Sequence, residues 1–163
     1  MAPKSAVFRL TLQLADLDRQ LYRDFPLTIA RHPSETDARM MLRVLAFALH
    51  ADDPLAFGRG ISNDDEPDLW LRALDGRIET WIELGAPDPD RLRKACGRSN
   101  RVLLYAYGDL AMPVWLRKHD TATVGPLCRC CTIIVLRQRA LFQPQTSGNP
   151  ARNLYRLRRR SPS

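Results

Sequence analysis

Residues 64–96 constrain the fold of this chain more than any other stretch. Residues 69–74 and 78–84 have the composition of β-strands, and Asp75-Gly76 between them is typical of a two-residue hairpin turn. Residues 85–90 are rich in Pro and Asp, and a helix over residues 91–98 is expected behind an Asp88 or Asp90 cap. Residues 102–107 form an apolar run, typical of a strand buried on both faces. A helical crossover makes the strands that it joins parallel, so the sequence predicts an α/β domain on a mixed sheet.

The first 50 residues predict a hairpin followed by a helix. Residues 7–14 alternate apolar and polar side chains, which indicates a half-buried strand, and residues 21–29 are its expected partner across a turn at 16–19. Ser34 is the expected N-cap of a helix that ends near His50, with Asp37 placed as in a capping box. The apolar stripe of this helix is predicted to be Met41, Leu42, Leu45, Ala46 and Leu49. A short strand near residues 57–61 and a short helix over 111–118 complete the expected elements.

The net charge of +7 is unevenly distributed along the 163 residues. Up to Lys118 there are 17 basic and 17 acidic residues, whereas the remaining 45 residues contain 8 Arg and a single acid, Asp120. The basic character therefore describes a C-terminal segment and says little about the body of the protein. We interpret residues 1–118 as one domain and residues 119–163 as a basic, atypical tail.

The tail has few signs of regular structure. A strand is possible over residues 132–137, but residues 142–152 are mostly Pro, Gln, Ser, Gly and Asn without a period. This composition predicts a poorly ordered segment. A shifted reading frame is our hypothesis for the bias, and translation of the other two frames of the DNA would test it.

Cysteine spacing and hydropathy argue against several classes of protein. Cys128, Cys130 and Cys131 lack a zinc-ligand spacing, and no His follows at the required distance. We therefore expect all four cysteines, Cys96 included, to be reduced thiols. No run approaches the ~18 apolar residues of a membrane span. The first residues do not resemble a secretory signal, and we expect a cytoplasmic protein without a membrane partner.

Acidic residues within an apolar strand are the main functional lead. In a strand over residues 78–84, Glu79, Trp81 and Glu83 project to one face. Exposure of that face to solvent would explain the presence of both Glu79 and Glu83. The functional alternative rests on Glu83, because it lies at the carboxyl end of the strand, where ligands usually bind in α/β sheets.

A second acidic cluster precedes the hairpin. Asp64, Asp65, Glu66 and Asp68 are explained equally by a solvated loop. The hairpin, however, would bring Asp68 opposite Glu83. Converging carboxylates repel one another, and a divalent cation with oxygen ligands relieves that repulsion. Such a site would bind Mg²⁺ or Mn²⁺ and activate a water for attack on a phosphodiester.

Two further groups are candidates for the same site. The basic residues at 91, 93 and 94 fit a solvated helix face, but one of them turned toward the sheet edge would hold a phosphate or steady an attacking hydroxide. Glu35 fits a helix-capping role, and its functional alternative is that of an extra metal ligand.

Three blocks of the sequence carry a resemblance to a known family. Residues 31–43 (RHPSETDARMMLR), 64–72 (DDEPDLWLR) and 81–96 (WIELGAPDPDRLRKAC) resemble the YaeQ family of small bacterial proteins, over about residues 1–118. That family is similar in fold to the PD-(D/E)XK nucleases, a restriction-endonuclease-like mixed sheet flanked by helices. The resemblance implies a nuclease-like site of Asp68 or Glu66, Glu83 and Lys94, with Glu35 and Glu79 nearby. The pattern expects Lys at position 85, where this chain has Gly, and Lys94 is the candidate substitute.

Two functions follow from this resemblance. The first is a Mg²⁺- or Mn²⁺-dependent phosphodiesterase that acts on nucleic acid, with Asp68 and Glu83 on the metal and Lys94 beside the nucleophile or the phosphate. The alternative is a non-catalytic binding module that uses the acidic pocket for a partner or a structural ion, as the missing Lys at position 85 favours. A nucleic-acid-binding role of the Arg-rich tail is a third and weaker hypothesis, because basic tails bind without specificity.

Overall fold

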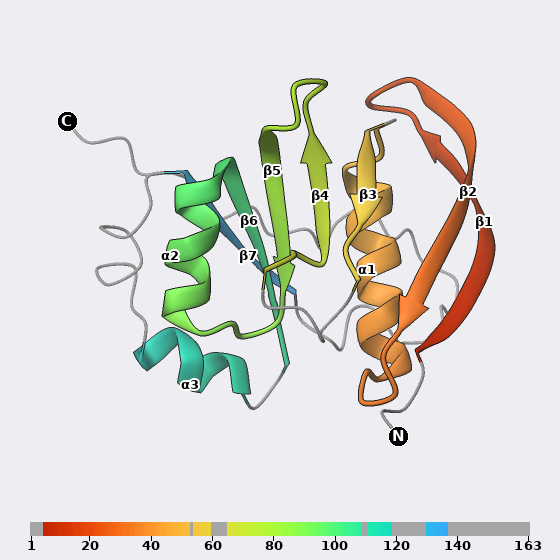
Figure 1. Cartoon of the computed structure of the whole chain (residues 1–163). Helices are drawn as coiled ribbons and strands as arrows, with labels where there is room; N and C mark the ends of the chain where they lie inside the picture. Colours follow the sequence, from red (N-terminus) through yellow and green to blue (C-terminus); the bar gives the residue numbers. More distant parts are fainter. Residues whose placement is uncertain (1–4, 53, 60–64, 109–110, 119–129, 137–163) are drawn as a thin grey trace.

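The structure is a computed structural model that describes residues 5–52, 54–59, 65–108, 111–118 and 130–136 (Figure 1). Its elements in chain order are β1 (Ala6–Asp16), β2 (Leu21–Arg31), α1 (Asp37–Leu49), β3 (Leu55–Phe57), β4 (Leu69–Arg72), β5 (Ile78–Leu84), α2 (Pro89–Arg98), β6 (Ser99–Tyr107), α3 (Ala111–Lys118) and β7 (Cys131–Leu136). The predicted elements are present in the described part of the chain, except that the short strand expected near residues 57–61 lies earlier, at Leu55–Phe57.

A mixed five-stranded sheet is the centre of the molecule, with the strand order β3-β4-β5-β6-β7. The β3–β4 and β4–β5 pairs are antiparallel, whereas β5–β6 and β6–β7 are parallel. The predicted α/β domain on a mixed sheet is therefore confirmed. None of the helices in the described ranges is long and apolar enough to cross a membrane.

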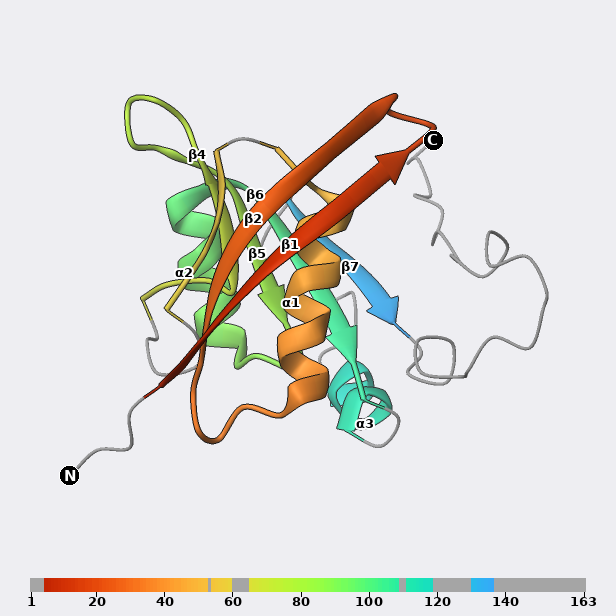
Figure 2. The same cartoon turned by 90° about the vertical axis from the view of Figure 1, so that its right-hand side faces the viewer.

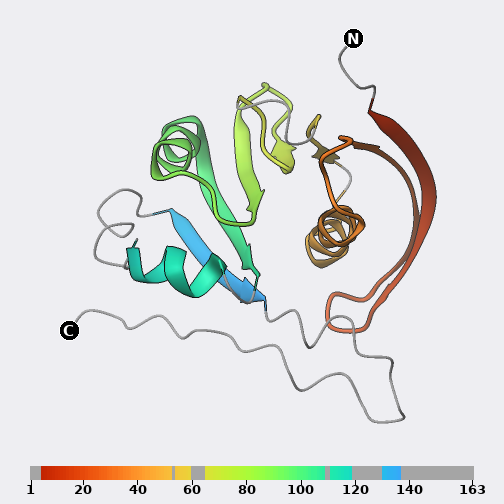
Figure 3. The same cartoon turned by 90° about the horizontal axis from the view of Figure 1, so that it is seen from below.

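Helices cover the two faces of the sheet differently (Figure 3). Helix α1 packs on one face, and the β1–β2 hairpin covers the far side of α1, as the turned view in Figure 2 shows. Helices α2 and α3 lie on the other face, where Trp115 of α3 donates to the carbonyl of Pro87 at 2.9 Å. The layers are thus hairpin, helix, sheet and helices.

Alternation along β5 and β6 divides the core in two. Ile82 and Leu84 pack against α1, while Trp81, the residue before Ile82, packs against α2. The same alternation holds in β6, whose residues from Val102 to Ala106 are all buried. This confirms that β6 is covered on both faces, as its continuous apolar run predicts.

The structure corrects the expected start and apolar stripe of α1. Its N-cap is Thr36, whose hydroxyl accepts from the backbone N–H of Arg39 at 3.2 Å, and not Ser34. Met41 and Leu49 are exposed rather than part of the stripe. Arg43 is fully buried among the apolar residues of the helix, a position that the periodicity did not predict.

The turn and Cys96 also differ from expectation, whereas Cys130 and Cys131 are reduced thiols as expected. The hairpin closes between Ala73 and Arg77, so its loop has three residues and ends at Gly76, whose φ is +87°. A three-residue loop requires a residue in the left-handed region, which glycine adopts at little cost. Cys96 is disulfide-bonded, so the expectation of reduced thiols is wrong for this residue.

The region after Lys118 is only partly described. Strand β7 confirms the expected strand near residues 132–137 and joins the main sheet beside β6. The predicted disorder and the shifted-frame hypothesis concern residues 119–129 and 137–163, which lie outside the described residues.

Candidate functional site

The register of the β4–β5 hairpin brings two acids together at one end of the sheet. Leu69 pairs with Ile82, so Asp68 lies beside Glu83 at the carboxyl end of β5. Both side chains are buried, with exposed fractions of 2% and 4%. The sequence-based prediction placed these two acids opposite each other, and the structure has this arrangement.

Asp68 is held mainly by α1. Both of its oxygens contact Nη2 of Arg39, at 2.8 and 2.9 Å, and Oδ2 also accepts from the backbone N–H of Leu84 at 2.8 Å. Burial raises the pKa of Asp68, and the charge of Arg39 opposes that rise. The carboxylate is thus desolvated, with a guanidinium supplying most of its compensation.

Glu35 extends this cluster along α1. Its Oε1 accepts from Arg39 Nη1 at 2.9 Å, and its Oε2 lies 3.4 Å from Arg43 Nη1. Arg43 in turn donates to the carbonyls of Ala30 at 2.9 Å and Gly58 at 3.0 Å. Glu35 and Arg43 therefore tie the head of α1 to the end of β2 and to the loop after β3.

Glu83 is held from the opposite face of the sheet. Its Oε1 accepts from Arg91 Nε of α2 at 2.8 Å, and its Oε2 accepts from Trp81 Nε1 at 3.0 Å. Burial first, and the charge of Asp68 second, raise the pKa of Glu83 from 4.5 to about 7. Asp68 and Glu83 therefore repel each other, although each has its own arginine on its own face of the sheet.

The other candidate residues lie at different distances from this pair. Glu66 turns its side chain toward Arg59, while its carbonyl accepts from Arg91 Nη2 at 2.8 Å. Lys94 is exposed and pairs with Asp65 outside the buried cluster. Glu79 lies near the start of β5, bonded to Asn100 Nδ2 at 2.7 Å, about 13 Å along the strand from Glu83.

The basic residue of α2 that turns toward the sheet edge is Arg91. Positions 91, 93 and 94 were all candidates, and Lys94 was selected through the resemblance. A helix presents residues three and four apart to one face, so 91 and 94 share a face in principle. Arg91 is one turn closer to Glu83, while Lys94 reaches the exposed Asp65.

Three residues of the site were not predicted from the sequence. Arg39 and Arg43 follow Glu35 at successive four-residue steps, which places the three side chains on one side of the helix. Arg43 also interrupts an apolar stretch of α1, and this charge within an apolar helix was the signal that could have identified it. Burial raises the pKa of Tyr107. The positive charge of Arg39 and a hydrogen bond with Arg39 oppose that rise, so Tyr107 lies close to Arg39. Nothing in the local pattern of β6 marked Tyr107.

Gly85 occupies a backbone conformation that explains its identity. Its φ is +103°, which glycine adopts readily and a side chain bearing a Cβ does not. Its N–H donates to the carbonyl of Tyr105 at 2.9 Å. A Lys at this position would be strained, so the backbone conformation at the end of β5 favours glycine.

The donor set allows a limited metal chemistry. Within the described ranges, no group of three or more His, Cys, Asp or Glu side chains is arranged to hold a metal ion. Asp68 and Glu83 supply hard carboxylate oxygens suited to Mg²⁺ or Mn²⁺. All four of these oxygens already contact N–H groups, so a cation would have to displace contacts of Arg39 or Arg91.

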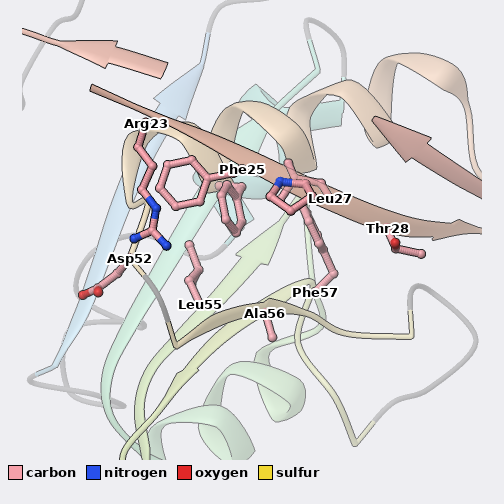
Figure 4. Close-up of a pocket in the computed structure, with 10 residues that line it drawn as sticks. Arg23, Phe25, Leu27, Thr28, Asp52, Leu55, Ala56 and Phe57 are labelled. Atoms are coloured by element: carbon pink, nitrogen blue, oxygen red, sulfur yellow. The ribbon is translucent and has the colours of Figure 1, made fainter. Parts of the chain in front are cut away.

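A separate cavity of about 410 Å³ lies between β2, the end of α1 and β3 (Figure 4). Phe25, Phe47 and Phe57 form its apolar part, and Phe47 stacks on Phe57 with ring centroids 5.4 Å apart. Arg23 and Asp52 lie at its rim. None of the candidate acids lines this cavity, so it is distinct from the carboxylate site.

The fold and its buried acid–arginine cluster define a class of mixed α/β protein whose site lies at the carboxyl end of a central strand. The family described as YaeQ protein matches residues 1–141, and the chain belongs to the YaeQ family. The matched region extends past Lys118, where the sequence analysis ended the resemblance.

Relatives and solved structures agree with this assignment. The uncharacterized protein YaeQ of Salmonella typhi is 47% identical over 121 residues, which cover 74% of this chain and 67% of the relative. The Escherichia coli K12 protein of the same name is 46% identical over 124 residues, covering 76% and 68%. The crystal structure of YaeQ from Xanthomonas axonopodis pv. citri is similar with a TM-score of 0.76 and 50% identity, covering 84% of this chain and 76% of that one. The YaeQ structure from Pseudomonas syringae gives 0.74 and 44%, covering 84% and 74%.

Proposed function

We propose that Asp68 and Glu83 bind a divalent cation, Mg²⁺ or Mn²⁺, and that the protein is a nuclease-like, restriction-endonuclease-type phosphodiesterase acting on nucleic acid. The observation that carries the proposal is the electrostatic imbalance at Glu83. Its pKa is raised to about 7 even though Arg91 contacts it, because it is buried beside the charge of Asp68. Buried carboxylates whose charges interact and perturb their pKa values are found preferentially at functional sites.

The roles of the side chains follow from their contacts. Asp68 and Glu83 would hold the cation, which when bound polarises a phosphoryl oxygen and lowers the pKa of a water. Arg91 is anchored to the carbonyl of Glu66 and stays beside Glu83. Arg39 would neutralise charge on the phosphate from the α1 side. Glu35 orients Arg39.

Cleavage assays with matched carboxylate variants test the proposal. Glu83→Gln and Asp68→Asn should each abolish Mn²⁺-dependent cleavage of single- or double-stranded DNA or RNA. Glu79→Gln is the control, because Glu79 lies on the same strand at its other end and contacts Asn100. Equal cleavage by Glu83→Gln and the wild-type protein would show that the activity is a contaminant and refute the assignment.

A non-catalytic binding module is the second candidate function. One observation favours it: each oxygen of Asp68 and Glu83 already accepts from an N–H group, and Lys94 is engaged with the exposed Asp65. This reading expects no turnover, but a melting temperature that rises with Mg²⁺ or Mn²⁺ concentration if the pocket takes a structural ion. Cleavage lost in Glu83→Gln would exclude it.

A further inference from the structure

One donor of the buried cluster has no acceptor. In the described part of the chain, Nε of Arg43 makes no hydrogen bond, although the side chain is completely buried. Its other two nitrogens are satisfied by Ala30, Gly58 and Glu35. An unsatisfied buried donor on a charged group is unfavourable and rare, so it requires an explanation.

The carboxylate of Asp68 lies near this donor. Oδ1 of Asp68 lies 4.0 Å from Arg43 Nε, about 1 Å beyond an ordinary hydrogen bond. The same oxygen is 2.8 Å from Arg39 Nη2. Asp68 therefore lies between two guanidinium groups and is bonded to the outer one.

The two arginines differ in what anchors them. Arg43 is fixed by backbone carbonyls from two other segments of the chain. Arg39 pairs with the carboxylates of Glu35 and Asp68, and its side chain is 13% exposed. Arg91, the third arginine of the site, is anchored by the Glu66 carbonyl. Among the described residues, Arg39 is the one of the three whose side chain shows no bond to a backbone carbonyl, so its ion pairs can be exchanged without breaking such a bond.

Charge balance gives the reason for an exchange. Three carboxylates face three guanidinium groups in the cluster: Glu35, Asp68 and Glu83 against Arg39, Arg43 and Arg91. A divalent cation on Asp68 and Glu83 would leave the site with a positive excess. An anionic phosphate is the counter-charge that a partly exposed arginine binds well.

We infer that a phosphate group binds Arg39 and moves it outward, and that Asp68 then accepts a hydrogen bond from Nε of Arg43 in place of Arg39. Arg39 is then a phosphate-binding residue, and Arg43 is a positioning residue. The inference rests on the proposed function for the identity of the anion, a phosphate of nucleic acid. The exchange itself needs only a movement of about 1 Å by the Asp68 carboxylate. Asp68 would keep a cationic partner and its bond from the Leu84 N–H throughout.

Arginine Nε–Hε resonances of ¹⁵N-labelled protein test the exchange without any activity. The resonance of Arg43 is assigned by its loss in Arg43→Lys. In Arg39→Gln it should shift downfield and exchange more slowly with water, because Asp68 then bonds to it. Arg93→Gln is the control, since Arg93 pairs with the exposed Asp90. An unchanged Arg43 resonance in folded Arg39→Gln would overturn the inference.

Inorganic phosphate tests the ligand. With Mg²⁺ present, phosphate should shift the Arg43 resonance of the wild-type protein in the same direction, and should bind about tenfold more weakly to Arg39→Gln, as for the loss of one charge-assisted hydrogen bond. No phosphate-induced shift would overturn the role of Arg39. If Arg39→Gln is unfolded, Arg39→Lys takes its place, since a single ammonium cannot contact Glu35 and Asp68 as the guanidinium does. If the Arg43 resonance shifts in Arg39→Gln but the wild-type protein does not bind Mg²⁺, the exchange of partners by Asp68 stands and the proposed metal-dependent function is refuted.

Discussion

Two acidic groups from one short stretch of chain have opposite surroundings. Asp68 is buried, contacts Arg39 and a backbone N–H, and has a raised pKa. Asp65, three residues earlier, is exposed, pairs with Lys94 and Arg98, and has a pKa lowered chiefly by the hydrogen bond from Lys94. The same kind of ion pair is therefore costly to disrupt at one position and nearly irrelevant to stability at the other, because only the first pair is removed from water.

The largest expected effect is that of breaking the buried pair. Asp68→Ala removes the carboxylate that contacts Arg39 Nη2 and accepts from the Leu84 N–H, and should lower the free energy of unfolding by about 3–5 kcal/mol. Urea denaturation measures this change, with Asp65→Ala as the exposed control. Similar losses for both variants would contradict the distinction between the two acids.

The pH dependence of stability should come next in size. The pKa of Glu83 is about 7 in the folded protein against an ordinary value of 4.5, so between these pH values the folded state retains a proton that the unfolded state has lost. Its stabilising contribution is complete below pH 4.5 and is lost as the pH rises through about 7, a change of about 3 kcal/mol at about 1.4 kcal/mol per pKa unit.

Glu83→Gln should flatten this dependence, as thermal unfolding from pH 5 to 8 would measure. Asp68 contributes with the same sign, since its pKa is also raised. Asp65 has the opposite sign, because its lowered pKa stabilises the protein above pH 3.8 and this contribution disappears as the pH falls. A slope in Glu83→Gln equal to that of the wild-type protein would show that Glu83 ionises normally.

A smaller effect is expected at the cap of the helix that carries Arg39 and Arg43. Thr36→Ala removes the acceptor for the Arg39 N–H and should cost about 1 kcal/mol. Ser34→Ala is the matched control, because the Ser34 hydroxyl contacts His32 outside the helix. Chemical denaturation that shows the larger loss for Ser34→Ala would restore the capping box that the sequence suggested.

The smallest effect is expected at Lys94. Lys94→Ala removes an exposed ion pair with Asp65 and should leave the denaturation midpoint unchanged within error. If the protein cleaves nucleic acid, this variant should also retain its rate, whereas Arg91→Gln should lose activity, since Arg91 contacts Glu83. Loss of activity in Lys94→Ala alone would return Lys94 to the catalytic role that the family resemblance implies.

Local features of the fold followed from the sequence because they depend on local forces. Alternation over residues 7–14 and the apolar run at 102–107 predicted the strands. Asp88 and Asp90 were both expected as caps of α2, and the structure has Asp88. The three-residue hairpin loop was missed, because Asp75-Gly76 fits both loop lengths and the cross-strand register selects between them. The start of α1 was missed for a similar reason, since Ser34 and Thr36 are both good caps.

The sequence by itself determined the strands, the helices and the juxtaposition of Asp68 with Glu83, because a short hairpin fixes which residues lie opposite one another. The tertiary structure alone decided which cation each acid receives. Arg39 and Asp68 are 29 positions apart and meet only because α1 packs across the end of β4. That packing also buried Arg43 and left Lys94 in water, and burial rather than residue type sets the strength of each ion pair.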